Sequence, residues 1–352
     1  MVAARLRIAL SFFSVTLGMS LGIDAAQAGA VNAAAWEWQA VSGTMCRDGS
    51  ETGFFLKRRP FDKNLVIYLE GGGACFNSLT CLSNPKNVGD QYPGQDGIFQ
   101  ERDDNPVNGW NFVHVPYCTG DIFAGTKENV QVPGVNGKQN FMGYRNMIKI
   151  MDQLKTMMPE LENVLVTGVS AGGFGAIFHY PTAKERWPDS RVVLLDDSGI
   201  PLEDEWLAPC LQQSFRSFWG INDALPEDCS ACRGENGGGL VELGRHLRER
   251  YGDGEKGMIL SYQDSTMRFF YGFGLNECRP PLFPNYPAQQ FEAGVKSLRE
   301  NYLKGGISTF VQAGSQHVYI SSKSFYETRA NGQNLASWVQ DLLNNQAQDR
   351  GP

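Results

Sequence analysis

Short aliphatic runs alternate with helical stretches along most of this chain, and this alternation limits the fold more than any other feature. It is typical of a parallel sheet whose strands are joined by crossover helices. The runs predict strands at 53–57, 64–69, 111–115, 163–167, 191–195, 257–261 and 305–311. The stretches between them predict helices at about 139–158, 171–187, 203–217, 238–251, 287–303 and 331–345. We therefore expect an α/β fold, a three-layer sandwich with a mostly parallel central sheet and helices on both faces.

The segment 139–158 shows the helical periodicity most clearly. Apolar residues recur in it at spacings of three and four, which predicts a helix with one face against the sheet. These residues, which we expect in the core, are Phe141, Tyr144, Ile148, Met151 and Leu154.

The N-terminal residues differ from the rest. Arg5 and Arg7 precede an apolar run at 8–23, and the small residues Ala26 and Ala28 follow it. This pattern is typical of a secretory signal peptide, and the run is shorter than the roughly 20 residues of a membrane span. We expect residues 1–28 to be a signal peptide, with a signal anchor as the alternative, and 29–352 to be a single domain that is secreted or periplasmic.

The composition excludes some classes of function. Hydrophobic residues make up 42% and charged residues 20%, as in globular proteins. The formal charge is -7, and loss of Arg5, Arg7 and Asp24 with the signal peptide would change it to -8. This charge argues against binding to nucleic acid. No later segment resembles a membrane span, and we expect a monomer.

The chain has eight cysteines, all beyond the expected cleavage site. An even number in an exported chain predicts disulfides, and Cys75 and Cys81 are near enough to close a small loop. Cys229 and Cys232 form a lone CxxC pair, which is also compatible with a redox or zinc site. A zinc site made of cysteines needs two such pairs, so a structural disulfide is the preferred interpretation. We expect no metal and no cofactor.

The pentapeptide Gly168-Val169-Ser170-Ala171-Gly172 matches the G-x-S-x-G pattern of serine hydrolases. The pattern alone is weak, because a Gly-Ser-Gly turn can be purely structural. Here it follows an aliphatic strand directly and leads into a helix, which places Ser170 on a strained strand-to-helix turn. Side chains two residues to either side would collide with the strand and the helix. The helix N-terminus would also direct the amide of Ala171 toward developing negative charge.

A serine nucleophile needs a base, usually histidine. His114 lies in an apolar strand, and His179 and His246 lie in expected helices. His317 follows the last expected strand, where hydrolases of this kind place their base, although an isolated loop histidine is often only a surface group. We expect His317 to be the base.

The acid should lie between serine and histidine in the chain. Asp264 ends the second strand after that of Ser170, which is the commoner position by analogy of fold. Asp196 and Asp197 end the first strand. We expect Asp264 to be the acid and keep Asp197 as the alternative, with a capping role as its structural interpretation.

A glycine-rich stretch follows the strand at 64–69 and reads Glu70-Gly71-Gly72-Gly73-Ala74-Cys75. Consecutive glycines leave backbone N–H groups accessible, and esterases use such a stretch for the second donor of the oxyanion hole. A flexible turn is the alternative. The pairing with the serine motif favours the oxyanion hole.

Several blocks of sequence together resemble the pectin acetylesterase and Notum family of ester hydrolases. They are Tyr68 to Asn77, Val115 to Asp121, Gly168 to Gly173, Asp197-Ser198-Gly199 and Gln316-His317. The resemblance implies an α/β-hydrolase fold and a triad of Ser170, Asp264 and His317. It also implies oxyanion donors at the amides of Gly72, Gly73 and Ala171, and disulfides Cys46–Cys118 and Cys75–Cys81. The pairing of Cys210, Cys229, Cys232 and Cys278 stays open.

One departure from the family concerns the glycine loop. The family has an aromatic residue in or beside this loop before the cysteine, where this chain has Gly73-Ala74. Loss of that ring is expected to open the mouth of the pocket. The resemblance therefore does not fix which acyl or sugar group the protein accepts.

The expected function is removal of acyl groups, foremost acetyl, from an extracellular ester such as an acetylated polysaccharide like pectin. The net negative charge favours a less anionic acetylated glycan over pectin itself. Two alternatives stay open: a Notum-like hydrolase of a longer acyl ester, and a catalytically silent glycan-binding protein.

Overall fold

The computed structural model describes residues 35–252, 255–281 and 284–352, and the predicted signal peptide lies outside them. These described residues belong to one compact unit. Within the described part of the chain, no helix has both the length and the apolarity that crossing a membrane would require.

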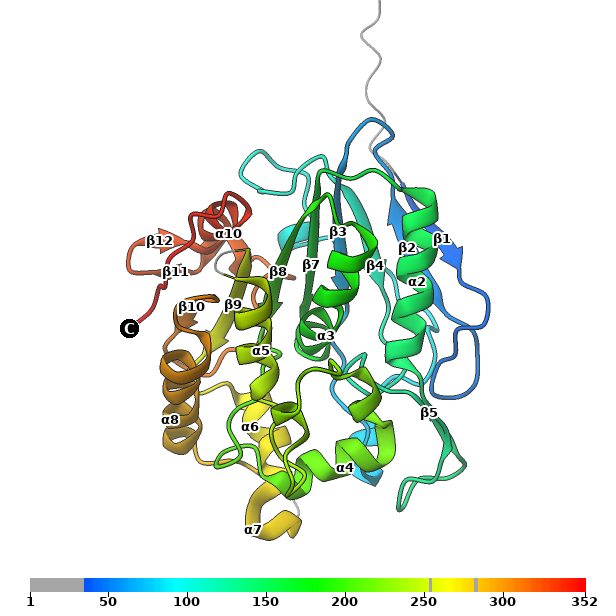
Figure 1. Cartoon of the computed structure of the whole chain (residues 1–352), viewed down its shortest axis with the longest axis vertical. Helices are drawn as coiled ribbons and strands as arrows, with labels where there is room; N and C mark the ends of the chain where they lie inside the picture. Colours follow the sequence, from blue (N-terminus) through cyan, green and yellow to red (C-terminus); the bar gives the residue numbers. More distant parts are fainter. Residues whose placement is uncertain (1–34, 253–254, 282–283) are drawn as a thin grey trace, which may run out of the picture. The chain divides into compact units, whose positions relative to one another are not determined.

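A central sheet of eight strands organises this unit (Figure 1). The first two strands at one edge pair antiparallel, with each other and with the third strand, and the other six run parallel. In spatial order the strands are β1 (Trp36–Ala40), β2 (Gly53–Lys57), β4 (Asn111–Val115), β3 (Asn64–Leu69), β7 (Asn163–Val169), β8 (Arg191–Asp197), β9 (Lys256–Ser261) and β10 (Ser308–Gln312).

Each central strand contributes side chains to both faces of the sheet, as the twofold repeat of a strand requires. In β3, Leu65, Ile67 and Leu69 join one hydrophobic cluster, whereas Val66 and Tyr68 join the other. Two apolar cores therefore sandwich the sheet, which accounts for the nearly continuous aliphatic runs of the parallel strands.

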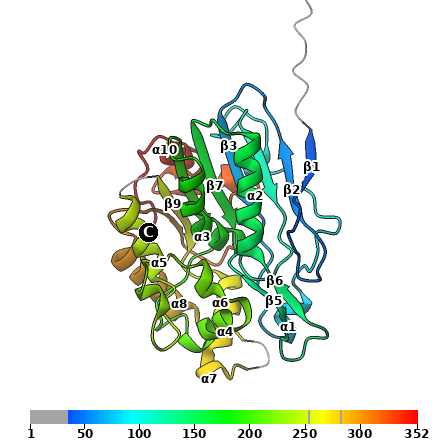
Figure 2. The same ribbon diagram turned by 45° about the vertical axis from the view of Figure 1, so that its right-hand side comes forward.

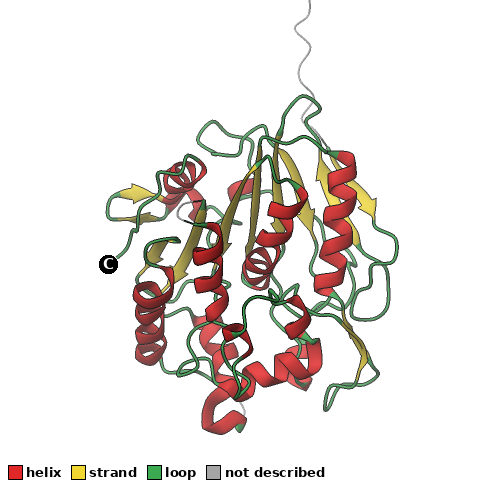
Figure 3. Cartoon of the chain, in the orientation of Figure 1, coloured by secondary structure: helices red, strands yellow, loops and turns green. Residues whose placement is uncertain are grey.

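Helices cover both faces of the sheet, so the predicted three-layer arrangement is confirmed (Figures 2 and 3). The core on the face of the sheet to which Leu65 points also contains buried side chains from six helices. They are α2 (Gly143–Met157), α3 (Ala171–Arg186), α4 (Pro209–Trp219), α5 (Glu242–Tyr251), α6 (Ser265–Tyr271) and α8 (Ala288–Leu298). The other core is shared with α9 (Ser324–Glu327), α10 (Leu335–Leu343) and the 3₁₀ turn Gly97–Phe99. Short helices α1 (Ser78–Leu82) and α7 (Leu275–Cys278) lie in loops at the end of the sheet where the parallel strands finish.

The elements differ from the sequence prediction mainly at their ends. The helix expected from residue 139 begins at Gly143, because Phe141 belongs to β6 (Gln139–Phe141), which pairs with β5 (Lys127–Val130). The strand expected at 305–311 begins at Ser308, since Gly305 has a φ of 82° and forms a turn. The edge strand β1 was not predicted, and none of its five residues is fully buried.

All eight cysteines are in disulfides. Cys46 bonds Cys118, and Cys75 bonds Cys81, as the resemblance implied. The other pairs, which the sequence left open, are Cys210–Cys278 and Cys229–Cys232. The lone CxxC pair is therefore bonded to itself.

Candidate active site

Ser170 lies at a sharp turn between β7 and α3. Its φ of 55° and ψ of -117° are unusual for a residue with a side chain. Its backbone N–H donates to the carbonyl of Asp197 at 2.7 Å, and its own carbonyl accepts from Phe174 N–H at 3.1 Å. These bonds hold the strained turn between the sheet and the first turn of the helix.

The two glycines of the pentapeptide have the steric role that the sequence suggested. A Cβ on Gly168 would lie 2.4 Å from the carbonyl oxygen of Gly172, and one on Gly172 would lie 2.0 Å from that of Leu69. Both contacts are with backbone atoms and are far inside van der Waals distance. Only glycine fits at these two positions, each two residues from Ser170, so the serine is held where β3, β7 and α3 converge.

Asp264 and His317 meet at the ends of neighbouring strands. Asp264 follows β9 and caps α6, accepting N–H bonds from Thr266 and Met267 at 2.9 Å each through Oδ1. Its Oδ2 lies 2.7 Å from Nδ1 of His317. Asp264 is 2% exposed. The cap fixes one carboxylate oxygen and leaves the other to hold the imidazole.

The second ring nitrogen of His317, Nε2, is buried and has no hydrogen-bond partner among the described residues. A histidine whose Nδ1–H is bound to a carboxylate carries its lone pair on Nε2. The Asp264 contact therefore favours the tautomer that can accept a proton at Nε2.

Asp197, the alternative acid, makes different contacts. Its Oδ2 accepts the backbone N–H groups of Tyr319 and Ile320 at 2.6 and 2.8 Å, and its Oδ1 accepts the Ser198 hydroxyl at 2.9 Å. Burial raises the pKa of Asp197 to about 6, and the bonds from Ile320 and Tyr319 act in the opposite direction. The structure brings Asp264, and not Asp197, to the imidazole.

The other three histidines lie in β4, α3 and α5. His179 is buried, with Nε2 2.8 Å from the carbonyl of Phe123, and burial lowers its pKa to about 4. His114 is buried in β4, and His246 lies 3.3 Å from Asp228. None of these three contacts a residue of the serine turn through a hydrogen bond in the described structure.

The glycine loop after β3 is oriented by two side chains far along the chain. Asn84 Nδ2 donates to the carbonyl of Gly72 at 2.6 Å, and the Tyr117 hydroxyl donates to that of Gly73 at 3.0 Å. The N–H and C=O of a trans peptide point in opposite directions. The amides of Gly73 and Ala74 are therefore directed away from Asn84 and Tyr117.

Gly73 and Ala74 line the same pocket as Ser170 and Ala171. Ala171 opens α3, and the first amides of a helix have no acceptor within it. Two of the three expected oxyanion donors, Gly73 and Ala171, thus border the serine's pocket together with Ala74. The sequence gave no reason to single out Ala74, because its orientation depends on Tyr117.

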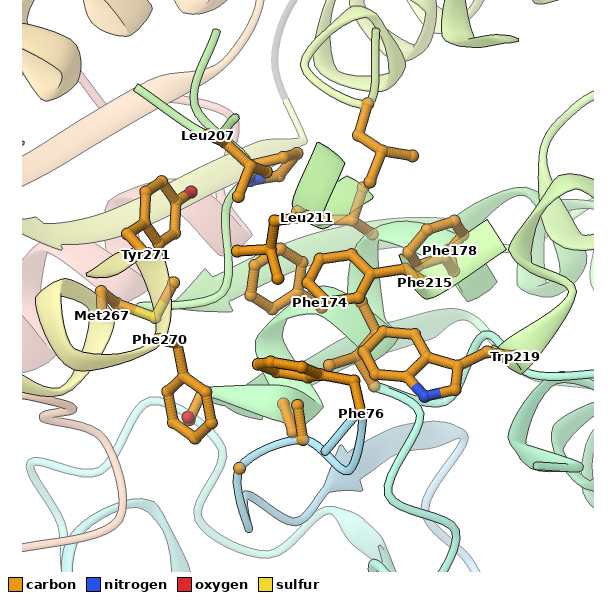
Figure 4. A pocket seen from close by; sticks show the side chains of 18 of the residues that line it. Phe76, Phe174, Phe178, Leu207, Leu211, Phe215, Trp219, Met267, Phe270 and Tyr271 are labelled. Atoms are coloured by element: carbon orange, nitrogen blue, oxygen red, sulfur yellow. The ribbon is translucent and has the colours of Figure 1, made fainter. Parts of the chain in front are cut away.

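An apolar pocket opens beside Ser170. The described residues that line it come mainly from the glycine loop and from α3, α4, α5 and α6, with others from the loops between them (Figure 4). Its aromatic lining consists of Phe76, Phe174, Phe178, Phe215, Trp219, Phe270 and Tyr271, and its main aliphatic lining of Ile122, Ile177, Leu207, Leu211, Leu240 and Leu243. The ring of Phe215 stacks on Trp219 with centroids 4.4 Å apart.

Apart from the hydroxyl of Ser170, the polar side-chain groups of this lining already have hydrogen-bond partners within the protein. Trp219 Nε1 donates to the carbonyl of Cys75 at 2.8 Å. The Tyr271 hydroxyl donates to the Ile200 carbonyl at 3.1 Å and accepts from Leu202 N–H at 2.9 Å. The pocket therefore presents almost only carbon to a ligand, next to the hydroxyl of Ser170. We refer to it below as the apolar pocket.

The absent aromatic residue of the glycine loop has a substitute. The ring of Phe270, from α6, lies 3.0 Å from the position that a Gly73 Cβ would take. Phe270 also contacts Phe76 edge to face, with centroids 6.4 Å apart. A ring from a distant helix therefore stands against that glycine, and both residues line the pocket.

The sheet order, the serine turn and the Asp264–His317 pair define an α/β-hydrolase fold. The family model described as Pectinacetylesterase matches residues 25–235, more than half of the chain. The chain belongs to the pectinacetylesterase family.

Named relatives fall into two groups. Palmitoleoyl-protein carboxylesterase NOTUM of Drosophila melanogaster is 27% identical over 208 residues, covering 53% of this chain and 31% of that one. Pectin acetylesterase 5 of Arabidopsis thaliana is 27% identical over 206 residues, covering 54% of this chain and 48% of that one. The matched region thus spans about a third to a half of these curated relatives.

The likeness in fold extends further. The structure of the Wnt deacylase Notum from Drosophila superposes with a TM-score of 0.70, covering 90% of this chain and 95% of that one, at 19% identity. At this identity the match shows a common fold. It confirms the predicted mostly parallel sheet with helices around it.

Proposed function

We propose that the protein is an exported serine carboxylesterase with Ser170 as nucleophile, His317 as base and Asp264 as the orienting acid. The observation that carries this proposal is the 2.7 Å contact between His317 and Asp264 at the strand ends beside the Ser170 turn. The family membership supports the same reaction. The four disulfides support export to an oxidising compartment.

In the proposed mechanism, Nε2 of His317 takes the proton of Ser170 as its oxygen attacks the ester carbonyl. Asp264 holds the Nδ1–H and stabilises the imidazolium cation. The alcohol leaves with that proton, and water activated by the same histidine then hydrolyses the acyl-enzyme. The amides of Ala171 and, in the glycine loop, of Gly73 and Ala74, which border the pocket of Ser170, stabilise the oxyanion in both steps.

The apolar pocket favours an ester whose acyl group is longer than acetyl. An acetyl group has one methyl to bury, whereas seven aromatic side chains border the space next to Ser170. Each buried methylene contributes about 0.8 kcal/mol, which is roughly fourfold in kcat/KM per carbon until the pocket is filled. We therefore place a longer acyl ester first for this site.

Deacetylation of a polysaccharide is the second candidate, supported by the pectin acetylesterase relatives. It would use the same triad and leave most of the pocket to other parts of the substrate. A catalytically silent glycan-binding protein is the third interpretation. It is disfavoured because Ser170, Asp264 and His317 are all present.

Turnover of p-nitrophenyl esters from acetate to palmitate tests the proposal. We expect kcat/KM to rise from acetate to a medium or long chain and the Ser170→Ala variant to lose about 10⁴-fold or more. A serine-directed fluorophosphonate should label the wild type and not this variant. Wild-type turnover in Ser170→Ala would reject the nucleophile, and absence of both turnover and labelling in folded wild type would favour the binding protein.

The chain-length series separates the two esterase candidates. A maximum at acetate, together with acetate release from acetylated pectin, xylan or chitin, would favour the polysaccharide. A maximum at longer chains would favour the substrate that fills the apolar pocket.

A further inference from the structure

Asp197 connects the nucleophile to the loop that carries the base. It is the last residue of β8 and is fully buried. Its carbonyl accepts the N–H of Ser170 at 2.7 Å. Its carboxylate accepts the N–H groups of Tyr319 and Ile320, which lie two and three residues beyond His317. A single residue therefore holds the backbone on both sides of the proposed proton transfer.

The backbone around Asp197 is strained at three residues. Ser170, Ser198 and Val318 have φ values of 55°, 67° and 57°. Val318 is β-branched and disfavours this region strongly. Its N–H donates to the Ser198 hydroxyl at 3.3 Å, and that hydroxyl donates to Asp197 Oδ1 at 2.9 Å. Conformations of this kind persist only where the surroundings hold them.

The loop of His317 has little regular structure of its own. Between β10 and α9 it forms no helix or strand, and the contact of His317 with Asp264 fixes the ring at Nδ1 alone. The direction in which Nε2 points therefore depends on the backbone at residues 318–320. The carboxylate of Asp197 and the hydroxyl of Ser198 bind all three amides of that stretch.

We propose that Asp197 is a positioning residue that holds the His317 loop in register with Ser170. The inference rests on the esterase function proposed above. Asp197 does not contact the imidazole through a hydrogen bond in the described structure and acts through the backbone of its neighbours. This role differs from that of Asp264, which holds the reacting ring itself.

Two substitutions at Asp197 separate positioning from the acid role. In Asp197→Asn the amide oxygen still accepts from Tyr319 and Ile320, while the NH₂ group donates to Ser198. In Asp197→Ala both N–H groups lose their partner. We expect Asp197→Ala to lower kcat by about 10- to 100-fold with KM within about threefold, since misplacement by about 1 Å is enough for such a loss. Asp197→Asn should restore kcat to within about fivefold of wild type.

Two further carboxylates provide the matched comparison. Asp264→Asn should lose about 10⁴-fold in kcat, because an amide favours the wrong tautomer of the histidine. Asp196 precedes Asp197 in the sequence, and its carboxyl is equally buried. This carboxyl accepts the N–H of Gly199 at 2.8 Å and makes no hydrogen bond to the His317 loop in the described structure, so Asp196→Asn is the control. It should keep the wild-type kcat and KM. Thermal unfolding and fluorophosphonate labelling are measured on every variant.

Wild-type kcat in a folded Asp197→Ala variant overturns the inference. A loss in Asp197→Asn as deep as that in Asp264→Asn also overturns it, because Asp197 would then be the acid. If Asp197→Ala does not fold, Ser198→Ala decides, since it removes the hydroxyl between Asp197 and Val318. We expect a three- to tenfold lower kcat in that variant, and an unchanged kcat rejects positioning. Failure of the proposed function is recognised separately, as absence of Ser170-dependent turnover in the wild type.

Discussion

The polar edge of the sheet and the apolar pocket beside it are built in different ways. The polar edge consists of Ser170, which directly follows β7, and of Asp264 and His317, which lie in the loops after β9 and β10. The apolar pocket is lined mainly by α3 to α6 and the glycine loop. Strands fix the first group through the register of the sheet, whereas helix packing fixes the second.

Under the proposed function, this difference assigns reaction and selectivity to different parts of the chain. The position of a strand end is held by hydrogen bonds along the whole sheet, so the reacting groups tolerate little displacement. Helices and loops over the sheet can change their side chains without moving those groups. Variants of the polar edge should therefore affect all esters alike, and variants of the pocket should affect them by chain length.

Among the variants that compare these two regions, the largest effect is expected for Gly172→Ala, which disturbs the polar edge. The new Cβ would lie 2.0 Å from the carbonyl oxygen of Leu69, so either β3 or the serine turn must move. We expect kcat/KM for acetate and long-chain esters to fall by at least about 10²-fold together. Turnover of the ester series and thermal unfolding measure it.

Gly244→Ala in α5 is the matched control. Its Cβ would meet only a side-chain methyl of Leu303 at an ordinary 3.6 Å, and alanine favours a helix more than glycine does. Activity should stay at the wild-type level. Equal activity in both variants would contradict the steric account of the serine turn.

A smaller and selective effect is expected for Leu211→Trp in the apolar pocket. Leu211 is 3% exposed and borders the pocket from α4, so the larger ring takes space from the acyl group (Figure 4). We expect kcat/KM for the long-chain ester to fall by about 10- to 100-fold, which matches the usual free-energy cost of overpacking an apolar site. The value of kcat/KM for the acetate ester should change by less than about threefold.

Ser217→Trp places the same ring on the exposed side of the same helix and should change neither ester. An equal loss of kcat/KM for the acetate and the long-chain ester in Leu211→Trp would show that the apolar pocket does not set the acyl selectivity. It would also favour an acetylated polysaccharide over a longer acyl ester as the substrate.

The smallest effect is expected for Asp196→Asn, which lies outside both regions and should change stability alone. Burial, reinforced by the nearby charge of Asp197, raises the pKa of Asp196 well above its ordinary value, and its Oδ2 has no partner among the described residues. Because the folded state keeps this proton longer than the unfolded state, the wild type loses stability as pH rises above about 4.

The asparagine variant lacks this loss, so its stability relative to wild type should rise by up to about 1.4 kcal/mol for each pH unit until the folded carboxyl also ionises. Urea unfolding midpoints of the two proteins between pH 4.5 and 8 measure the difference. A difference that stays constant over this range would contradict the assigned titration.

The sequence predicted the central strands well because their aliphatic runs are long and are bounded by turns. The expected strands at 53–57, 64–69 and 111–115 coincide with β2, β3 and β4. It predicted helix starts less well, since Pro209 sets the start of α4 six residues after the expected position. The hairpin of β5 and β6 was missed because its pairing joins two short segments with no alternating pattern.

In the candidate site, too, the features that depend on local sequence were predicted, and those that depend on distant contacts were not. Ser170 and the glycine loop are recognisable from local sequence, because each depends on glycines next to a strand. The sequence favoured Asp264 as the acid and kept Asp197 as the alternative, since both follow buried strands. The apolar pocket was not foreseen at all. No single stretch beyond the expected signal peptide is long and apolar, and the lining of the pocket gathers side chains from residues 73 to 271.

The sequence by itself determined the alternating fold, the strained serine turn and the proposed order of serine, acid and histidine. These depend on periodicity and on glycines whose neighbours are a few residues away. Only the tertiary structure decided that Asp264 meets His317, that Asp197 binds the loop beyond it, and that Phe270 stands against Gly73. Those contacts join residues from 53 to almost 200 positions apart, and their geometry arises only when the sheet and its helices have packed.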